Sequence, residues 1–170
     1  MVNVEALFVQ HQERVFRYLC RAVGHAETAR DLTQDVFVRA TGAPTALADD
    51  ASARAWLFTI ARNLALDHHR RSRRRDRPLD PPASASGRAT QEVTAAVREA
   101  LARLGDLDRD VFLMRETAGL SYADIARVCA LSPEAVRSRI HRARLELRSL
   151  LAAPIRHRLR GELPGSTRNK

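Results

Sequence analysis

The chain has 170 residues, enough for one domain or two small ones, and carries 29 Lys and Arg against 20 Asp and Glu. Aromatic residues make up only 5%, and the prevalence of Ala, Leu, Arg and Glu favours helix over strand. Because no run of about 18 apolar residues and no signal-peptide pattern occurs, we expect no membrane insertion and a cytoplasmic protein.

The charge is distributed unevenly along the chain. Residues 1–50 carry a net charge of −2, whereas residues 51–170 carry +11. A GC-rich genome would explain why 28 of the 29 cations are Arg, but it would not explain this distribution. The asymmetry predicts two kinds of partner: a basic or polar one for the first part and a polyanion for the second.

Two amphipathic helices are predicted at the start of the chain, over residues 4–23 and 26–40. Phe8 belongs to the stripe of the first helix that we expect to be buried, and Gly24 ends that helix. The second helix has an acidic and amide face opposite its apolar stripe, formed by Asp31, Gln34, Asp35 and Val38. This face suits a basic helical partner; the alternative is an ordinary solvated surface.

A loop is predicted over residues 41–51, followed by a helix that Ser52 caps and that runs to about Arg71. One stripe of this helix is a mixed aromatic, amide and cationic surface of Trp56, Asn63, Arg70 and Arg71. Such a surface could stack on an unpaired base and hold phosphate, although a core position is an equally good interpretation for Trp56. His68 and His69 diverge by about 100° and cannot bind one metal ion together.

Residues 72–91 are predicted to be a mobile linker, because they combine an Arg run with Pro, Ser, Ala and Gly and have no apolar period. We therefore expect two halves that fold separately. The second half should contain helices over residues 93–104 and 109–118, and a final helix running through Leu151.

Residues 121–145 have the layout of a helix-turn-helix. Ser121 with Asp124 resembles a capping box, and Ser132 with Pro133 marks a second helix start. Ala130 stands where many such turns have Gly. The second helix offers donors to base edges and phosphates: Arg137, Ser138, Arg139, His141, Arg142 and Arg144. The alternative is an ordinary helical hairpin with a cationic face.

The chain resembles the extracytoplasmic-function (ECF) group of bacterial sigma factors over about residues 5–150. The segment DLTQDVFVRA (31–40) is similar to the region 2 helix that docks on the polymerase clamp. AWLFTIARNLALDHHRR (55–71) is similar to the helix that reads and melts the minus-ten element. GLSYADIARVCALSPEAVRSRIHRARLELR (119–148) is similar to the region 4 helix-turn-helix.

The resemblance implies an all-α fold of two small helical domains: region 2 (residues 1–71), the linker (72–91), region 4 (92–152) and a basic tail (153–170). It assigns Asp31, Gln34, Asp35 and Val38 to core RNA polymerase, and it assigns Trp56, Asn63, Arg70 and Arg71 to the minus-ten element. The donors of the final helix would read minus-thirty-five DNA. An anti-sigma factor is a further expected partner.

Two features depart from the family pattern, and two alternatives remain. The loop 41–51 lacks the aromatic residue often found there, and the tail, with a net charge of +4, has no recognised counterpart.

An autonomous helix-turn-helix regulator would explain residues 119–148 but not 26–71. A nuclease would need a carboxylate cluster for Mg²⁺ that the sequence lacks. No catalytic motif occurs, so no enzyme, cofactor or metal site is expected.

Overall fold

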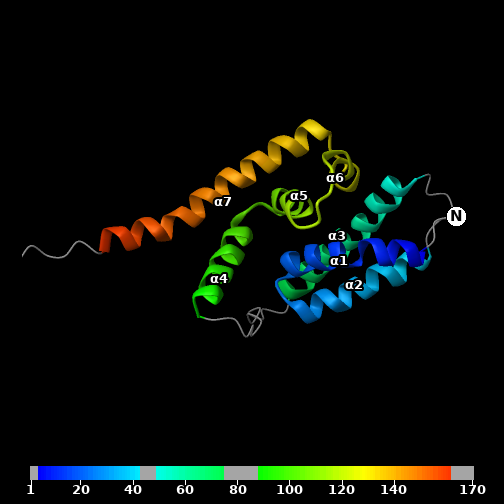
Figure 1. Ribbon diagram of the computed structural model, residues 1–170, viewed down its shortest axis with the longest axis horizontal. Helices are drawn as coiled ribbons and strands as arrows, with labels where there is room; N and C mark the ends of the chain where they lie inside the picture. Colours follow the sequence, from blue (N-terminus) through cyan, green and yellow to red (C-terminus); the bar gives the residue numbers. More distant parts are fainter. Residues whose placement is uncertain (1–3, 43–48, 75–87, 162–170) are drawn as a thin grey trace, which may run out of the picture.

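The computed structural model describes residues 4–42, 49–74 and 88–161. Within these ranges all regular structure is α-helical, as expected (Figure 1). The first half consists of α1 (Val4–Val23), α2 (Ala26–Thr41) and α3 (Asp50–Arg74). The second half consists of α4 (Arg88–Arg103), α5 (Asp106–Glu116), α6 (Tyr122–Cys129) and α7 (Pro133–Gly161). None of the described helices is long and apolar enough to cross a membrane.

The first three helices form one small bundle because each has an apolar stripe that the other two cover. Val15, Tyr18 and Leu19 of α1 are fully buried, and the ring of Tyr18 meets Phe58 of α3 edge-on at 5.9 Å. Gly24 closes α1 with a positive φ of 78°, and its N–H donates to the carbonyl oxygen of Cys20. A residue with a Cβ would be strained in this conformation, so α1 ends where the glycine predicts.

The helix-turn-helix is formed by α6 and α7, with α5 packed beneath them. Ser121 caps α6 by accepting a hydrogen bond from the Asp124 N–H at 3.1 Å, and Ser132 accepts one from the Ala135 N–H at 3.2 Å. Both predicted helix starts are therefore confirmed. The turn between the helices passes through Ala130 in the left-handed conformation, with φ 53° and ψ 49°.

The strained turn gives a direct stability prediction. Ala130→Gly should raise the free energy of unfolding by about 1 kcal/mol, because glycine adopts a left-handed conformation without the steric cost that alanine has there. Ala95→Gly is the matched control: the same substitution at an exposed site in the interior of α4 should lower stability by about 1 kcal/mol. Chemical denaturation measures both, and a loss of stability in Ala130→Gly would contradict the argument.

Several predicted boundaries differ from those observed. Ser52 does not cap α3: the helix begins at Asp50, and the carboxylate of Asp49 accepts the Ser52 N–H at 2.6 Å. Helix α3 continues to Arg74 and α4 begins at Arg88, so both extend into the linker expected over residues 72–91. Residues 75–87 of that range lie outside the described residues. The last helix continues past Leu151 to Gly161, into the range expected for the tail.

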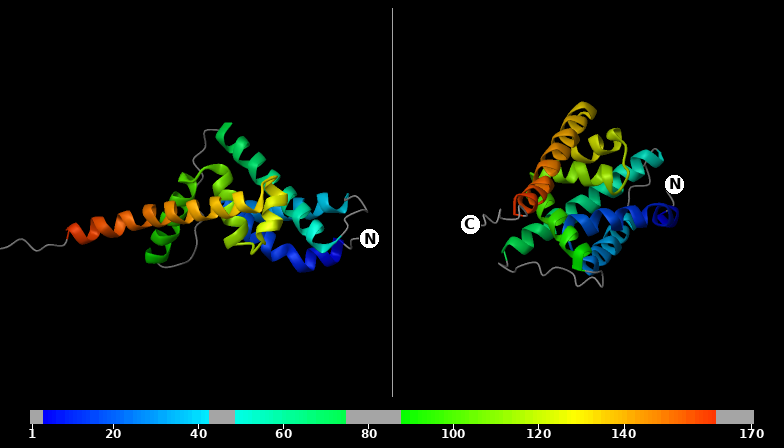
Figure 2. Two further views of the ribbon diagram at one scale, coloured as in Figure 1. Left: turned by 90° about the horizontal axis from the view of Figure 1, so that it is seen from above. Right: turned by 60° about the vertical axis from the view of Figure 1, so that its left-hand side comes forward.

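The two halves of the chain touch each other in the folded structure. Helix α6 lies along α3, and α5 approaches α1, so that buried residues of both halves form one continuous apolar cluster. The three views agree that α5 and α6 lie beside the first bundle, while α7 extends away from it (Figures 1 and 2). The sequence predicts two separate helical units, and no local pattern in it predicts a contact between them.

Candidate functional site

The predicted acidic and amide face of α2 is exposed. Asp31, Gln34, Asp35 and Val38 all point outward, because Leu32, Val36 and Ala40 hold the opposite side of the helix in the core. The side chain of Val38 is 67% exposed. The structure thus brings these four residues together on one open surface, and this surface combines negative charge with an apolar centre.

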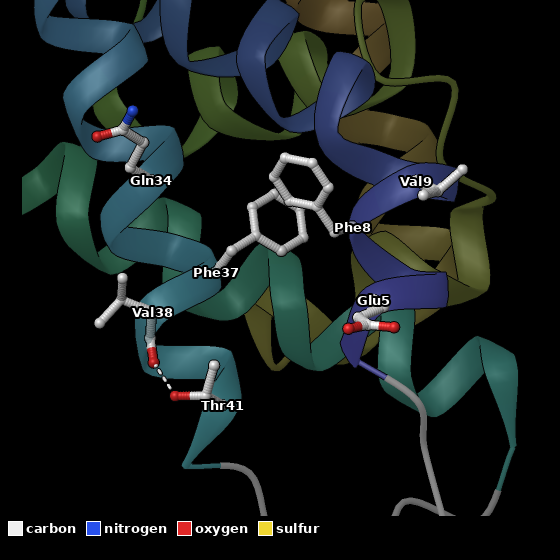
Figure 3. A pocket seen from close by; sticks show the side chains of 7 residues that line it. All are labelled: Glu5, Phe8, Val9, Gln34, Phe37, Val38 and Thr41. Carbon is white, nitrogen blue, oxygen red and sulfur yellow. Dashed lines mark hydrogen bonds between the residues drawn. The ribbon is translucent and has the colours of Figure 1, made fainter.

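An apolar groove of about 690 Å³ lies beside this face, between α1 and α2 (Figure 3). Phe8 and Phe37 meet edge-on at 4.8 Å across it, and Val9 stands at its α1 side. The prediction that Phe8 belongs to the buried stripe of α1 is wrong, since Phe8 is 40% exposed. Residues shared with the α2 face, Gln34 and Val38, line the same groove.

The aromatic and cationic stripe of α3 is only partly open. Asn63, Arg70 and Arg71 are exposed, and Arg70 forms an exposed ion pair with Asp67 at 3.4 Å. Trp56 is half-buried and packs against the core cluster, so it has both a core side and an accessible side. The two interpretations proposed for this tryptophan are therefore compatible.

The end of this stripe is held against α1 by histidine. The Nε2 atom of His69 lies 2.9 Å from the carbonyl oxygen of Ala22, which ties α3 to the end of α1. Burial, with a smaller contribution from Arg71, lowers the pKa of His68, so its ring is neutral at pH 7 and adds no charge to the stripe. Among the described residues, no cluster of His, Cys, Asp or Glu could hold a metal ion.

The predicted reading face of α7 divides into a centre and two edges. Val136, Ile140, Ala143 and Leu147 are buried, and opposite them Ser138, His141 and Arg142 form the exposed centre. With Arg137 and Arg139 they line one shallow surface. The guanidinium group of Arg137 lies over the Tyr122 ring at 5.8 Å, an aromatic contact that was not predicted from the sequence.

Two of the predicted DNA-contacting arginines are tied to α5. Arg139 donates to Asp108 at 2.6 Å, and only 29% of its side chain is exposed. Arg144 pairs with Glu116 at 2.5 Å on the opposite edge of α7, and this hydrogen bond raises the pKa of Arg144. Arg139 is therefore placed to orient α7 on α5, and Arg144 lies away from the surface that the other five residues share.

A second apolar groove lies on the side of Arg144, between α4, α5 and α7. Val97, Leu101, Phe112 and Leu151 form its floor. Three arginines that also line the groove would favour an acidic partner: Arg21, Arg144 and Arg148. No local sequence pattern predicts this groove, because its lining comes from α4, α5, α7 and the end of α1.

Comparison with known proteins matches both halves of the chain. The family described as sigma-70 region 2 matches residues 7–75, and the one described as sigma-70, region 4 matches residues 94–147. The RNA polymerase sigma factor YlaC of Bacillus subtilis is 32% identical over 158 residues, which cover 86% of this chain and 90% of YlaC. The ECF RNA polymerase sigma factor SigL of Mycobacterium tuberculosis is 35% identical over 156 residues, which cover 87% of this chain and 88% of SigL.

Solved structures have the same arrangement of helices. CnrH, determined in complex with the cytosolic domain of CnrY, superposes with a TM-score of 0.65 at 27% identity over 88% of each chain. The sigma factor RpoE of Bartonella quintana, determined with the anti-sigma factor NepR, gives a TM-score of 0.63 at 23% identity over 87% of this chain and 96% of that one. At that identity the second likeness supports the fold alone.

Proposed function

Because this chain belongs to the ECF group of RNA polymerase sigma factors, we propose that its exposed surfaces divide promoter-directed initiation of transcription between them. The observation that carries this proposal is the presence, on one chain, of three separate surfaces: the exposed α2 face, the partly open α3 stripe and the exposed α7 face. A factor that recruits polymerase, opens DNA and reads duplex DNA needs all three.

The α2 face is the proposed contact with core RNA polymerase. Asp31, Gln34 and Asp35 supply acceptors for a basic helix of the partner, and Val38 extends the contact into the neighbouring groove. Interfaces of this kind combine a buried apolar centre with a charged rim that orients the partner. Residues 1–71 would then act as region 2.

The α3 stripe is the proposed minus-ten surface. Asn63 would bind the edge of an unpaired base, Trp56 would stack on its accessible side, and Arg70 and Arg71 would meet phosphates. Extruding a base costs a few kcal/mol, and these contacts would offset that cost only after the strands separate. The surface is thus suited to stabilising open rather than closed DNA.

Loss of the Asn63 amide should therefore impair promoter opening. Asn63→Ala should lower run-off transcription from a duplex promoter by about tenfold, the equivalent of one lost base contact of 1–3 kcal/mol. Binding to core polymerase should be unchanged, since Asn63 is exposed on α3 and away from the α2 face. Permanganate reactivity of the minus-ten thymines measures opening. Wild-type reactivity in the variant would contradict this role.

The α7 face is the proposed minus-thirty-five reader. Its centre, with Ser138, His141 and Arg142, would enter the major groove, while Arg137 and Arg144 at one edge would lie near phosphates. Arg139 would act mainly through its pair with Asp108, which orients the helix. Residues 92–152 would then act as region 4, with the linker 72–91 allowing the two regions to separate.

We further expect an anti-sigma factor to act on the same surfaces. The two apolar grooves, one beside the α2 face and one lined by Arg21, Arg144 and Arg148, would accept amphipathic helices. An occupant of the first groove would compete directly with polymerase, since Gln34 and Val38 belong to both. The proposed role is regulatory and not enzymatic, and its site is the cytoplasm, where polymerase acts.

Run-off transcription with purified core RNA polymerase tests this function. Transcripts should start at a defined promoter only when the chain is added, and the chain should co-purify with core enzyme. The competing function, an autonomous helix-turn-helix regulator, would bind duplex DNA without affinity for core enzyme and would need no α2 face. Promoter binding without any binding to core polymerase would favour that alternative.

A further inference from the structure

One carboxylate of α5 contacts two arginines of the α7 face. Asp108 lies in the first turn of α5, and its Oδ1 atom accepts a hydrogen bond from Nη1 of Arg139 at 2.6 Å. The same Oδ1 atom lies 3.9 Å from Nη2 of Arg142. Because both arginines belong to α7, this carboxylate joins the start of α5 to the surface that α7 exposes.

The three side chains differ in how far they are covered. Asp108 is 23% exposed and Arg139 is 29% exposed, whereas Arg142 is 62% exposed. A charged hydrogen bond that is partly withdrawn from water is screened less than a fully exposed one, and is therefore stronger. Asp108 and Arg139 thus form the fixed part of this group, and the tip of Arg142 can reach outward to DNA.

The surface that these arginines share is strongly cationic. Arg137, Arg139 and Arg142 line it together. Arg139 and Arg142 are three positions apart on one helix, a spacing at which like charges repel each other. The carboxylate of Asp108 lies against both guanidinium groups and offsets this repulsion. Arg142 can therefore stay beside Arg139 in a defined direction.

An arginine without a partner and an arginine held in one direction act differently on DNA. Phosphates occur at every position of a duplex, so an arginine that reaches them raises the affinity for all sequences alike. A guanidinium group that binds two acceptors on one base edge must instead arrive in a defined orientation. Sequence preference is the difference between these two affinities, so a carboxylate that occupies one arginine and orients the next increases it.

We propose that Asp108 determines the sequence preference of the α7 face by withholding Arg139 from phosphates and orienting Arg142 toward a base edge. The inference rests on the proposed reading of minus-thirty-five DNA by α7. Asp108 acts through the two arginines, so it is a positioning residue. Its removal should raise general affinity for DNA and lower base preference, whereas the loss of a purely structural contact between α5 and α7 would weaken binding to every sequence.

Asp108→Asn in the full chain tests this role, because it removes the charge and keeps the size of the side chain. Binding is measured at several salt concentrations to a duplex with the minus-thirty-five element of the run-off promoter and to one with that element scrambled. At low salt, affinity for the scrambled duplex should rise at least about threefold, and the salt dependence should steepen by about one unit. The ratio of the two affinities should fall about fivefold.

Asp106→Asn is the matched control, since it removes the same charge from the same turn of α5. Asp106 pairs with Arg109 of its own helix at 2.7 Å, so its loss should leave the salt dependence and the affinity ratio nearly unchanged. A second comparison isolates Arg142. When Arg142→Ala is already present, adding Asp108→Asn should no longer alter the base preference but should still steepen the salt dependence.

The possible results separate the parts of the proposal. Weaker binding of Asp108→Asn to both duplexes, with an unchanged ratio, would show that Asp108 only supports the packing of α5 on α7. An unchanged salt dependence would refute the withholding of Arg139. An equal loss of preference with and without Arg142→Ala would refute the orientation of Arg142. Failure of run-off transcription would instead refute the proposed function, while the steeper salt dependence on scrambled DNA would still be expected.

Discussion

Replacing Asp35 by Arg together with Gln34 by Ala is expected to abolish binding to core RNA polymerase while leaving the fold intact. Both side chains are exposed on α2, opposite the buried Leu32 and Val36, so the substitutions remove no core contact. A new cation would face the basic helix expected in the partner, and like charges brought together in an interface cost several kcal/mol. A pull-down with core enzyme measures the loss.

The control for this prediction is Glu146→Arg, which produces the same charge reversal on an exposed site of α7. It should bind core polymerase with nearly wild-type affinity. Circular dichroism and thermal unfolding should coincide for the wild type and for the double substitution at Gln34 and Asp35, because surface changes away from special features rarely exceed about 0.5 kcal/mol. Retained affinity of that double variant for core enzyme would show that the α2 face is not the polymerase contact.

The elements predicted best from the sequence are those defined by local signals. Helices α1 and α2 have clear apolar periods, and Gly24, Ser121 and Ser132 mark boundaries that the structure confirms. The prediction that Ser52 caps α3 is wrong, because a second potential capping residue, Asp49, lies three positions earlier. The carboxylate of Asp49 accepts the Ser52 N–H, so the serine lies inside the first turn.

The contact between the halves could not be predicted, because it depends on residues that no local pattern connects. Arg54 and Asp124 are 70 positions apart, and each also has a local partner, Asp50 for the arginine and Ser121 for the aspartate. In the sequence both therefore look like ordinary surface and capping residues. Arg139 and Arg144 of α7 were predicted to contact DNA, and their pairing with Asp108 and Glu116 depends on the packing of α5, which no local pattern predicts.

That packing sharpens the expected difference between Arg142 and Arg144. Arg142 lies at the centre of the exposed α7 face with 62% of its side chain exposed, and its contact with Asp108 is long, at 3.9 Å. Arg142→Ala should cost about 1–3 kcal/mol of promoter affinity and relax the preference at one minus-thirty-five base pair. The effect should appear in a panel of promoters that differ at single minus-thirty-five positions.

Arg144→Ala should behave differently, since Arg144 lies at the edge of α7, paired with Glu116. Its proposed partner is a phosphate, so its loss should weaken binding to all promoters about equally and flatten the salt dependence by about one unit. The lost ion pair with Glu116 should alter stability little, because exposed pairs contribute about 0–1 kcal/mol. Binding of both variants at several salt concentrations separates the roles. If Arg142→Ala also lowered affinity uniformly, with no change in base preference, α7 would dock on DNA through a different face.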